Sequence, residues 1–117
     1  MALVEDGGPA VAWWATRVEC ASALFRLRRE GVIDETALTR ALKKVDVFFE
    51  KCLEVGPSEE VRKRAIRILR AHPLRAAGAL QLAAALIACR EDPASLPFVS
   101  SDQGLRAAAE KEGFTVL

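Results

Sequence analysis

The alternation of apolar and polar positions along the chain predicts helices joined by short apolar runs. The clearest helical stripe follows Asp34 and reaches Cys52. Its apolar side chains recur at steps of three and four residues: Leu38, Ala41, Leu42, Val45, Phe48, Phe49 and Cys52. This spacing is typical of an amphipathic helix. The apolar face would meet either the core or a second copy of the chain, and the sequence leaves both open.

The helix before this stripe is predicted from the residues at its ends. Thr16 and Glu19 fit a capping box, in which the threonine oxygen accepts from the third backbone N–H and the glutamate reaches back. Gly31 is expected just past the last turn. The side chains that this helix would turn inward are Val18, Ala21, Leu24 and Phe25.

Three more helices are predicted in the second half of the chain. Ser58 caps a helix whose inner face would be Val61, Ala65, Ile68 and Leu69. Pro73 suits the first turn of the next helix, which would run to about Arg90. Residues 76–89 within it are too few and too rich in alanine to span a bilayer, so a buried helix is expected. Asp102 begins the last helix, and Gly113 ends it.

Short apolar runs lie between these helices. Residues 11–15, 97–100 and 114–117 are compatible with buried strands, and a short extended piece is expected at residues 52–55. Residues 7–9 (GGP) mark a break before the first run. Strands that alternate with helices favour a parallel sheet covered on both faces. With 117 residues, the chain is expected to form one α/β domain.

Composition and charge add few constraints. Hydrophobic residues make up 51% of the chain and charged residues 28%, which is ordinary for a folded domain. The formal charge of +1 does not by itself indicate a nucleic-acid partner. Cys20, Cys52 and Cys89 lack the close spacing of a zinc site, and no secretory segment precedes them. We therefore expect buried free thiols in a cytoplasmic protein.

Two acidic residues follow predicted strands. Glu19 comes after residues 11–15, and Asp102 comes after residues 97–100. The carboxyl ends of parallel strands share one edge of a sheet, where ligands gather. Carboxylate oxygens there can converge on Mg²⁺ or Mn²⁺. Each acid also suits the first turn of its own helix, so capping alone would explain both.

Three sequence blocks change the balance between these two interpretations. They are residues 16–19 (TRVE), residues 72–86 (HPLRAAGALQLAAAL) and residues 98–105 (FVSSDQGL), followed by residues 113–117 (GFTVL). In order and spacing, they resemble the PIN-domain family, and specifically the toxin nucleases of the VapC type. The resemblance extends from Ala10 to the end of the chain.

The resemblance implies a three-layer α/β/α fold and a Mg²⁺-dependent endoribonuclease, the toxin of a toxin–antitoxin pair. Its expected partners are an RNA substrate, an antitoxin protein and a second copy of the chain, with no membrane association. By resemblance, Glu19 and Asp102 occupy metal-binding positions. Ser100 matches a hydroxyl residue near the site, and Arg75 is placed for a phosphate contact.

The chain departs from the family pattern at two acidic positions. Family members have a first, central strand that ends in aspartate, and no such strand precedes residues 10–15 here. They also have an aspartate where this chain has Gly78. We therefore expect an incomplete PIN-like domain over residues 1–117, with its first strand missing or displaced by truncation or by a mis-assigned start. Metal binding would be weak or lost and cleavage impaired, and the alternative is an inactive PIN-fold interaction module.

Several other residues are open to two interpretations. The Lys63, Arg64, Arg67 and Arg70 face is either a solvated helix surface or an RNA contact. Of Trp13 and Trp14, one is expected in the core and the other partly exposed, where it could stack on a base. His72 is interpreted as a helix-entry residue, and Gln81 as a side chain that lines the site.

Overall fold

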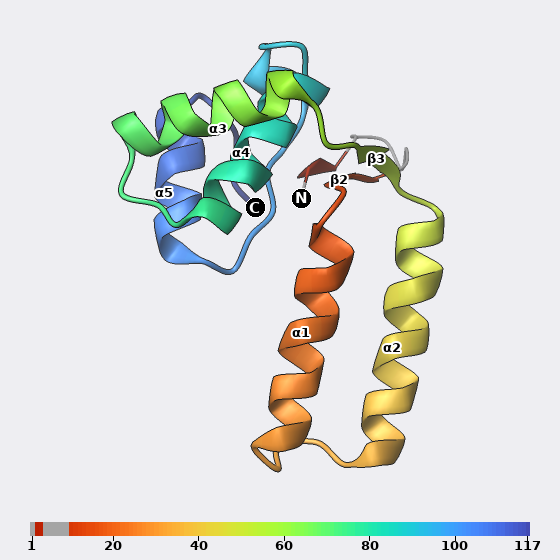
Figure 1. Ribbon diagram of the computed structural model, residues 1–117. Coiled ribbons are helices and arrows are strands. Elements are labelled where there is room, and N and C mark those ends of the chain that lie inside the picture. Colours follow the sequence, from red (N-terminus) through yellow and green to blue (C-terminus); the bar gives the residue numbers. More distant parts are fainter. Residues whose placement is uncertain (1, 4–9) are drawn as a thin grey trace.

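The protein is described by a computed structural model that covers residues 2–3 and 10–117. The break predicted at residues 7–9 lies outside the described residues. The elements in chain order are β1 (Ala2–Leu3), β2 (Ala10–Trp13), α1 (Thr16–Arg29), α2 (Glu35–Glu50), β3 (Leu53–Val55), α3 (Glu59–Ala71), α4 (Ala76–Ala88), the short 3₁₀ helix η1 (Pro93–Ser95) and α5 (Gln103–Lys111). Together they form a mixed α/β structure dominated by helices (Figure 1).

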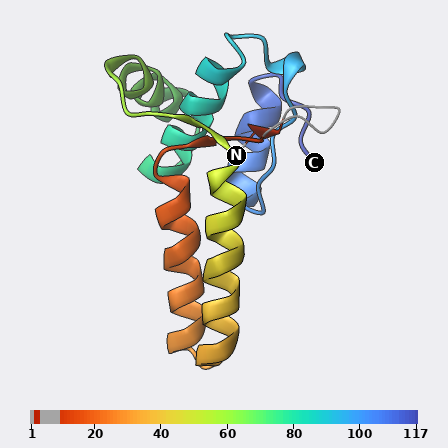
Figure 2. The same cartoon turned by 90° about the vertical axis from the view of Figure 1, so that its right-hand side faces the viewer.

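Helices α1 and α2 form an antiparallel hairpin, here called the helical arm, that projects from the rest of the molecule (Figures 1 and 2). Asp34 caps α2, because its side chain accepts from the backbone N–H of Ala37. Gly31 ends α1 with a φ of +76°, a left-handed conformation that glycine adopts without strain. An exposed ion pair of 2.9 Å joins Arg17 to Asp46 across the arm. Exposed pairs of this kind contribute little to stability.

The sheet is small and only partly parallel. Strand β2 lies between β1 and β3; it pairs in parallel with β3 and antiparallel with β1. The strands predicted at residues 97–100 and 114–117 are reduced to one parallel bridge, between Phe98 and Val116. The backbone N–H of Leu117 donates to the carbonyl of Phe98 over 3.0 Å, which closes this bridge. The expectation of a wholly parallel sheet is therefore wrong for the described residues, because β1 occupies an edge of β2 in the antiparallel direction.

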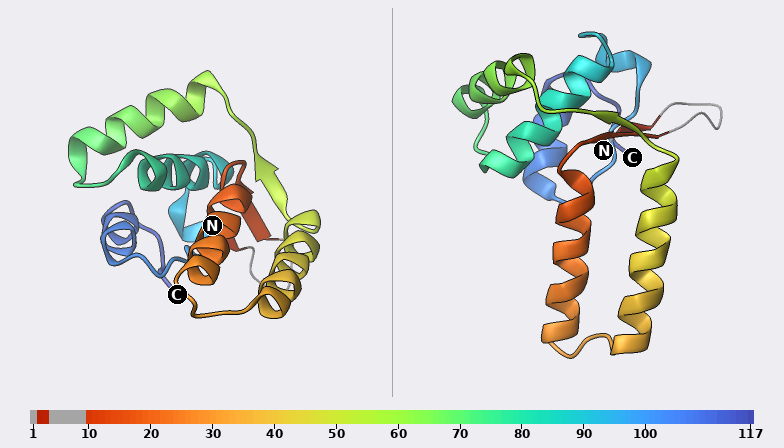
Figure 3. Two further views of the ribbon diagram at one scale, coloured as in Figure 1. Left: turned by 60° about the horizontal axis from the view of Figure 1, so that its bottom comes forward. Right: turned by 45° about the vertical axis from the view of Figure 1, so that its right-hand side comes forward.

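The core is built around α4, as predicted. Its residues Ala79 and Leu82 to Leu86 are all buried. The helix contacts α3, α5 and β2 (Figure 3). Phe98 and Phe114 stack at a centroid distance of 5.4 Å in the same cluster. Among the described residues, none of the helices has the length and apolar character that a bilayer span requires.

The predicted inner faces of the outer helices are only partly confirmed. In α3, Val61, Ala65 and Ile68 are buried but Leu69 is exposed. In α1, Val18 is 68% exposed and Phe25 is 44% exposed. The arm projects from the core, so α1 packs against α2 over most of its length and the rest of its surface faces outward (Figure 2). Apolar spacing correctly predicted these helices but not what covers them.

Two predicted helix starts are wrong. The residue before α1 is Ala15, and the hydroxyl of Thr16 lies inside the first turn, buried and without a hydrogen-bond partner among the described residues. Helix α4 begins at Ala76 and not at Pro73. His72 ends α3 with an extended backbone (φ −134°, ψ 144°), which the residue before a proline favours, and its buried ring lies 2.6 Å from a carboxylate oxygen of Glu112. The backbone N–H of Leu74 donates to the carbonyl of His72 over 2.9 Å, so the chain makes a tight turn before α4 begins.

The cysteines and tryptophans follow the predictions in part. Cys20, Cys52 and Cys89 are free thiols, but only Cys89 is buried, and the other two are half-buried. Trp13 is buried and Trp14 exposed, as expected for one core and one surface ring.

Candidate functional site

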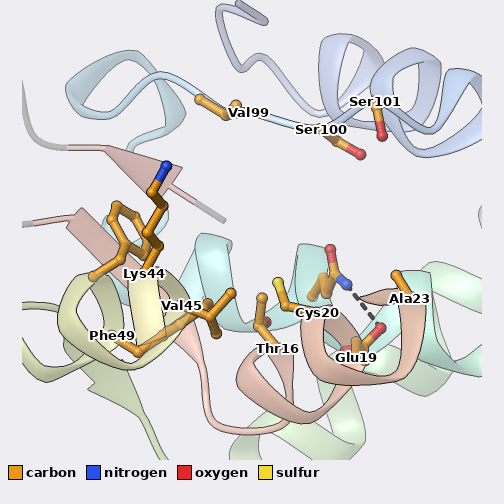
Figure 4. A pocket seen from close by; sticks show the side chains of 12 residues that line it. Thr16, Glu19, Cys20, Ala23, Lys44, Val45, Phe49, Val99, Ser100 and Ser101 are labelled. Carbon is orange, nitrogen blue, oxygen red and sulfur yellow. Dashed lines mark hydrogen bonds between the residues drawn. The ribbon is translucent and has the colours of Figure 1, made fainter. Parts of the chain in front are cut away.

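A cavity of about 530 Å³ lies where the helical arm joins the rest of the molecule (Figure 4). Helix α1 contributes Glu19 and Cys20, and α2 contributes Lys44 and Phe48. Gln81 of α4 lies beside Glu19. The segment of residues 99–101 faces these helices from the other side. Most of the lining is apolar, so the few polar groups determine what the cavity can recognise.

Glu19 points into this cavity and is held there by a partner on another helix. Its Oε2 accepts a hydrogen bond of 3.0 Å from Nε2 of Gln81, and both side chains are half-buried. The capping box predicted for Glu19 is absent, because the carboxylate binds the amide of Gln81 instead of the start of its own helix. The prediction that Gln81 lines the site is confirmed.

Ser100 also lines the cavity, and three hydrogen bonds fix its segment. Its Oγ accepts from the backbone N–H of Asp102 over 3.1 Å. Nη1 of Arg106 donates to the carbonyl of Ser100 over 3.0 Å and also to the carbonyl of Leu117. The end of the chain and the start of α5 therefore hold the polar wall of the cavity in place.

Asp102 is the N-cap of α5. Its Oδ1 accepts from the backbone N–H of Leu105 over 2.9 Å, and the side chain is exposed. It is not among the residues that line the cavity. The structural interpretation of Asp102 as a capping residue is thus confirmed, whereas Glu19 alone of the two acids faces the cavity.

Gly78 lies on α4 and is not among the residues that line the cavity. It precedes Gln81 by three residues on α4, so the two positions share one face of the helix. A β-carbon at position 78 would lie 3.8 Å from Leu105 and 4.0 Å from Leu74, which are ordinary contacts. Leu105 is the residue whose N–H binds Asp102. A side chain at position 78 would therefore start among apolar neighbours, near the first turn of α5.

Arg75 does not contribute to the cavity. It is the exposed N-cap of α4 and forms no ion pair with a described residue. An arginine there is free to contact a ligand that approaches the start of α4. The structure does not bring it together with Glu19.

The described residues contain no group of three or more histidine, cysteine or acidic side chains placed to hold a metal ion. One oxygen of Glu19 is engaged by Gln81, and one oxygen of Asp102 is engaged by a backbone N–H. A site for Mg²⁺ or Mn²⁺ needs oxygen ligands that converge on one point. The described residues therefore do not by themselves make a complete metal site.

Cys20 is a cavity residue that the sequence analysis did not single out. Burial and the negative charge of Glu19 raise the pKa of its thiol. The thiol is therefore protonated at neutral pH and a poor nucleophile. Lys44 and Phe48 were also missed as cavity residues, although their spacing of four on α2 places them on one face.

Comparisons with known proteins assign no function to this cavity. A scan against models of protein families finds no match to the chain, and a search of curated proteins finds none either. The interpretation therefore depends on the residues of the cavity and on their geometry.

Proposed function

We propose that the chain is a PIN-like domain of the VapC toxin type, with the three-layer fold of that family and an impaired endoribonuclease centre. One observation carries the proposal: Glu19 and Ser100, which come from separate sequence blocks of the resemblance, line the same cavity. The position of Gly78 adds support, because the family pattern has a further acid there and a β-carbon at this position would approach Leu105, whose backbone N–H binds Asp102.

Impairment follows from the missing carboxylates. Two acids neutralise a divalent ion but hold it weakly until substrate phosphates join. Mg²⁺ or Mn²⁺ is thus a weakly bound cofactor in this proposal. Its partners are RNA, an antitoxin protein and a second copy of the chain, in the cytoplasm. Loss of a charged, positioning group in a nuclease centre typically costs orders of magnitude in rate.

The test is to restore the missing acid. Gly78→Asp should raise cleavage of structured RNA in Mn²⁺ at least tenfold over the unchanged chain. Gly78→Asn is the matched control, because it has the same shape without the charge and should stay at background. Adding Glu19→Ala to the restored form should abolish the gain.

Two outcomes would contradict the nuclease proposal. Equal background cleavage by Gly78→Asp and Gly78→Asn would show that this position does not complete a catalytic centre. Cleavage that survives Asp102→Ala in the restored form would show that the assignment of Asp102 is wrong.

A second candidate function is favoured by the helical arm. The arm exposes large apolar side chains on both helices, including Val18, Phe25 and Val47. Exposed apolar surface of this kind marks sites of association. We propose that an inactive form of the domain would act by pairing with a second copy through the arm. Sedimentation equilibrium should then show a dimer that Val18→Lys and Phe25→Lys dissociate, and a monomer at all concentrations would refute this function.

A further inference from the structure

A second hollow, of about 410 Å³, lies on α2 beside the cavity that contains Glu19. Its lining consists of three lysines, Lys43, Lys44 and Lys51, around Val47 and Phe48. The described residues contribute no carboxylate to this lining, and none of the three lysines forms an ion pair with them. We call this surface the lysine hollow.

The lysine hollow and the cavity have a common wall. Lys44 and Phe48 line both of them. Figure 4 shows Lys44 extending from α2 along the cavity, on the side that faces Val99. A linear ligand that crosses this wall would contact the lysines at one end and the surroundings of Glu19 at the other.

The ring of Phe48 is exposed and held in place. It is 39% exposed and packs edge-to-face against the buried ring of Phe49, at a centroid distance of 5.2 Å and an interplanar angle of 90°. The Sγ of Cys52 donates to the carbonyl of Phe48 over 3.4 Å, at the end of the helix. A fixed aromatic ring surrounded by cations is the arrangement that binds single-stranded nucleic acid, because bases stack on the ring while phosphates neutralise the charges.

We propose that the lysine hollow is a binding subsite for single-stranded RNA. A base stacks on Phe48, and the neighbouring phosphates lie against Lys43, Lys44 and Lys51. This inference rests on the proposed function, since the strand would continue over Lys44 and Phe48 into the cavity with Glu19.

The charge of the hollow favours RNA over a protein partner. Lysine is depleted at protein–protein interfaces, where its strongly hydrated ammonium group must lose water. Three adjacent lysines around a floor of two apolar side chains would make such an interface costly. Phosphates instead release counterions when they meet lysines, which drives binding at low salt.

The experiment measures binding without cleavage. The Glu19→Ala chain is titrated against a fluorescent oligouridine in EDTA, by anisotropy at several salt concentrations. Combined Lys43→Gln, Lys44→Gln and Lys51→Gln should reduce the slope of log affinity against log salt by about 2, because each phosphate contact on a single strand contributes about 0.7. Phe48→Ala should weaken binding about 5- to 150-fold, the range for loss of one base–aromatic stack, and Phe48→Trp should restore it.

The matched control carries the same change of charge on another helix. Combined Lys63→Gln, Arg67→Gln and Arg70→Gln alters the outer face of α3, where all three side chains are exposed. It should leave the slope nearly unchanged. An equal reduction by both triple variants would overturn the proposal, because it would show attraction by total charge alone.

Other outcomes separate this inference from the proposed function. If an acidic amphipathic peptide binds the hollow in a manner that depends on Lys43, Lys44 and Lys51, while the oligouridine does not bind, the partner is a protein and the RNA subsite is refuted. If Gly78→Asp fails to cleave RNA while the lysine and Phe48 variants weaken binding as expected, only the nuclease proposal fails. If Gly78→Asp cleaves RNA while the lysine variants leave binding unchanged, only the subsite fails.

Discussion

Oε2 of Glu19 accepts a hydrogen bond of 3.0 Å from Nε2 of Gln81, and this bond joins the base of the helical arm to the core helix α4. Among the described residues, the ion pairs of α1 and α2 join residues within the arm and do not reach the core. The pair therefore couples the placement of the arm to the geometry of the cavity.

The first prediction concerns this coupling. Glu19→Ala and Gln81→Ala should each destabilise the protein, and a double-mutant cycle should give a coupling energy of about 1 kcal/mol, typical of a half-buried hydrogen bond to a charged group. Urea denaturation measures all four forms. Glu19→Ala combined with Gln103→Ala, on the exposed start of α5, is the control and should show no coupling. An additive Glu19/Gln81 cycle would mean that the two side chains do not interact in solution.

Substitutions of Asp102 should separate its role as the cap of α5 from its proposed role in RNA cleavage. Asp102→Ala should cost about 1 kcal/mol of unfolding free energy, because the N–H of Leu105 loses its acceptor. Asp102→Asn keeps an acceptor oxygen and should cost little. In the Gly78→Asp background, however, Asp102→Asn should remove cleavage while thermal unfolding stays the same. If stability and cleavage fall together in Asp102→Asn, the two roles cannot be separated.

The buried hydroxyl of Thr16 has no hydrogen-bond partner among the described residues. Valine has nearly the same shape without the hydroxyl, so Thr16→Val should leave stability unchanged or raise it by about 1 kcal/mol. Thr16→Ser keeps the hydroxyl, removes a methyl group and should destabilise. A clear loss of stability in Thr16→Val would indicate that a ligand or water in the cavity binds this oxygen.

His72 and Glu112 fix the segment between α3 and α4. His72→Phe keeps a ring of similar size but leaves Glu112 without its partner, and should cost about 2 kcal/mol in urea unfolding. Glu112→Gln retains an acceptor for the imidazole and should cost less than half as much. Equal losses in the two variants would show that charge, and not the hydrogen bond, holds the segment.

The thiol of Cys20 should react slowly at neutral pH. Burial and the charge of Glu19 raise its pKa above the ordinary value of about 8.5, so alkylation should accelerate only at higher pH than for a free thiol. The raised pKa favours the folded state at neutral pH, and this contribution is lost as pH rises above the unfolded value. The measurement uses Cys52→Ser/Cys89→Ser protein, with the urea-unfolded chain as control. A pH profile equal to that of the unfolded chain would contradict the prediction.

Some features followed from the sequence because their causes are local. Ser58 was predicted as a cap and Asp34 as the start of its helix, and each accepts from a backbone N–H three residues ahead. Gly31 and Gly113 end their helices with positive φ, at +76° and +102°. Residues 76–89 were predicted as a buried helix from composition alone. These signals act within one turn of the chain, so no distant residue is needed to interpret them.

Other features were decided only by the tertiary structure. Glu19 and Asp102 carry the same chemical signal in sequence, an acid in the first turn of a helix, yet one faces a cavity and the other caps α5. The difference is that Gln81 lies beside Glu19 only after α1 and α4 have packed. Likewise, the residues at its ends predicted α1 and apolar spacing predicted α2, but neither signal predicted their projection from the core (Figure 1). Periodicity determines which face of a helix is apolar, whereas the surfaces that meet in the folded chain determine what covers that face and which polar partner a side chain finds.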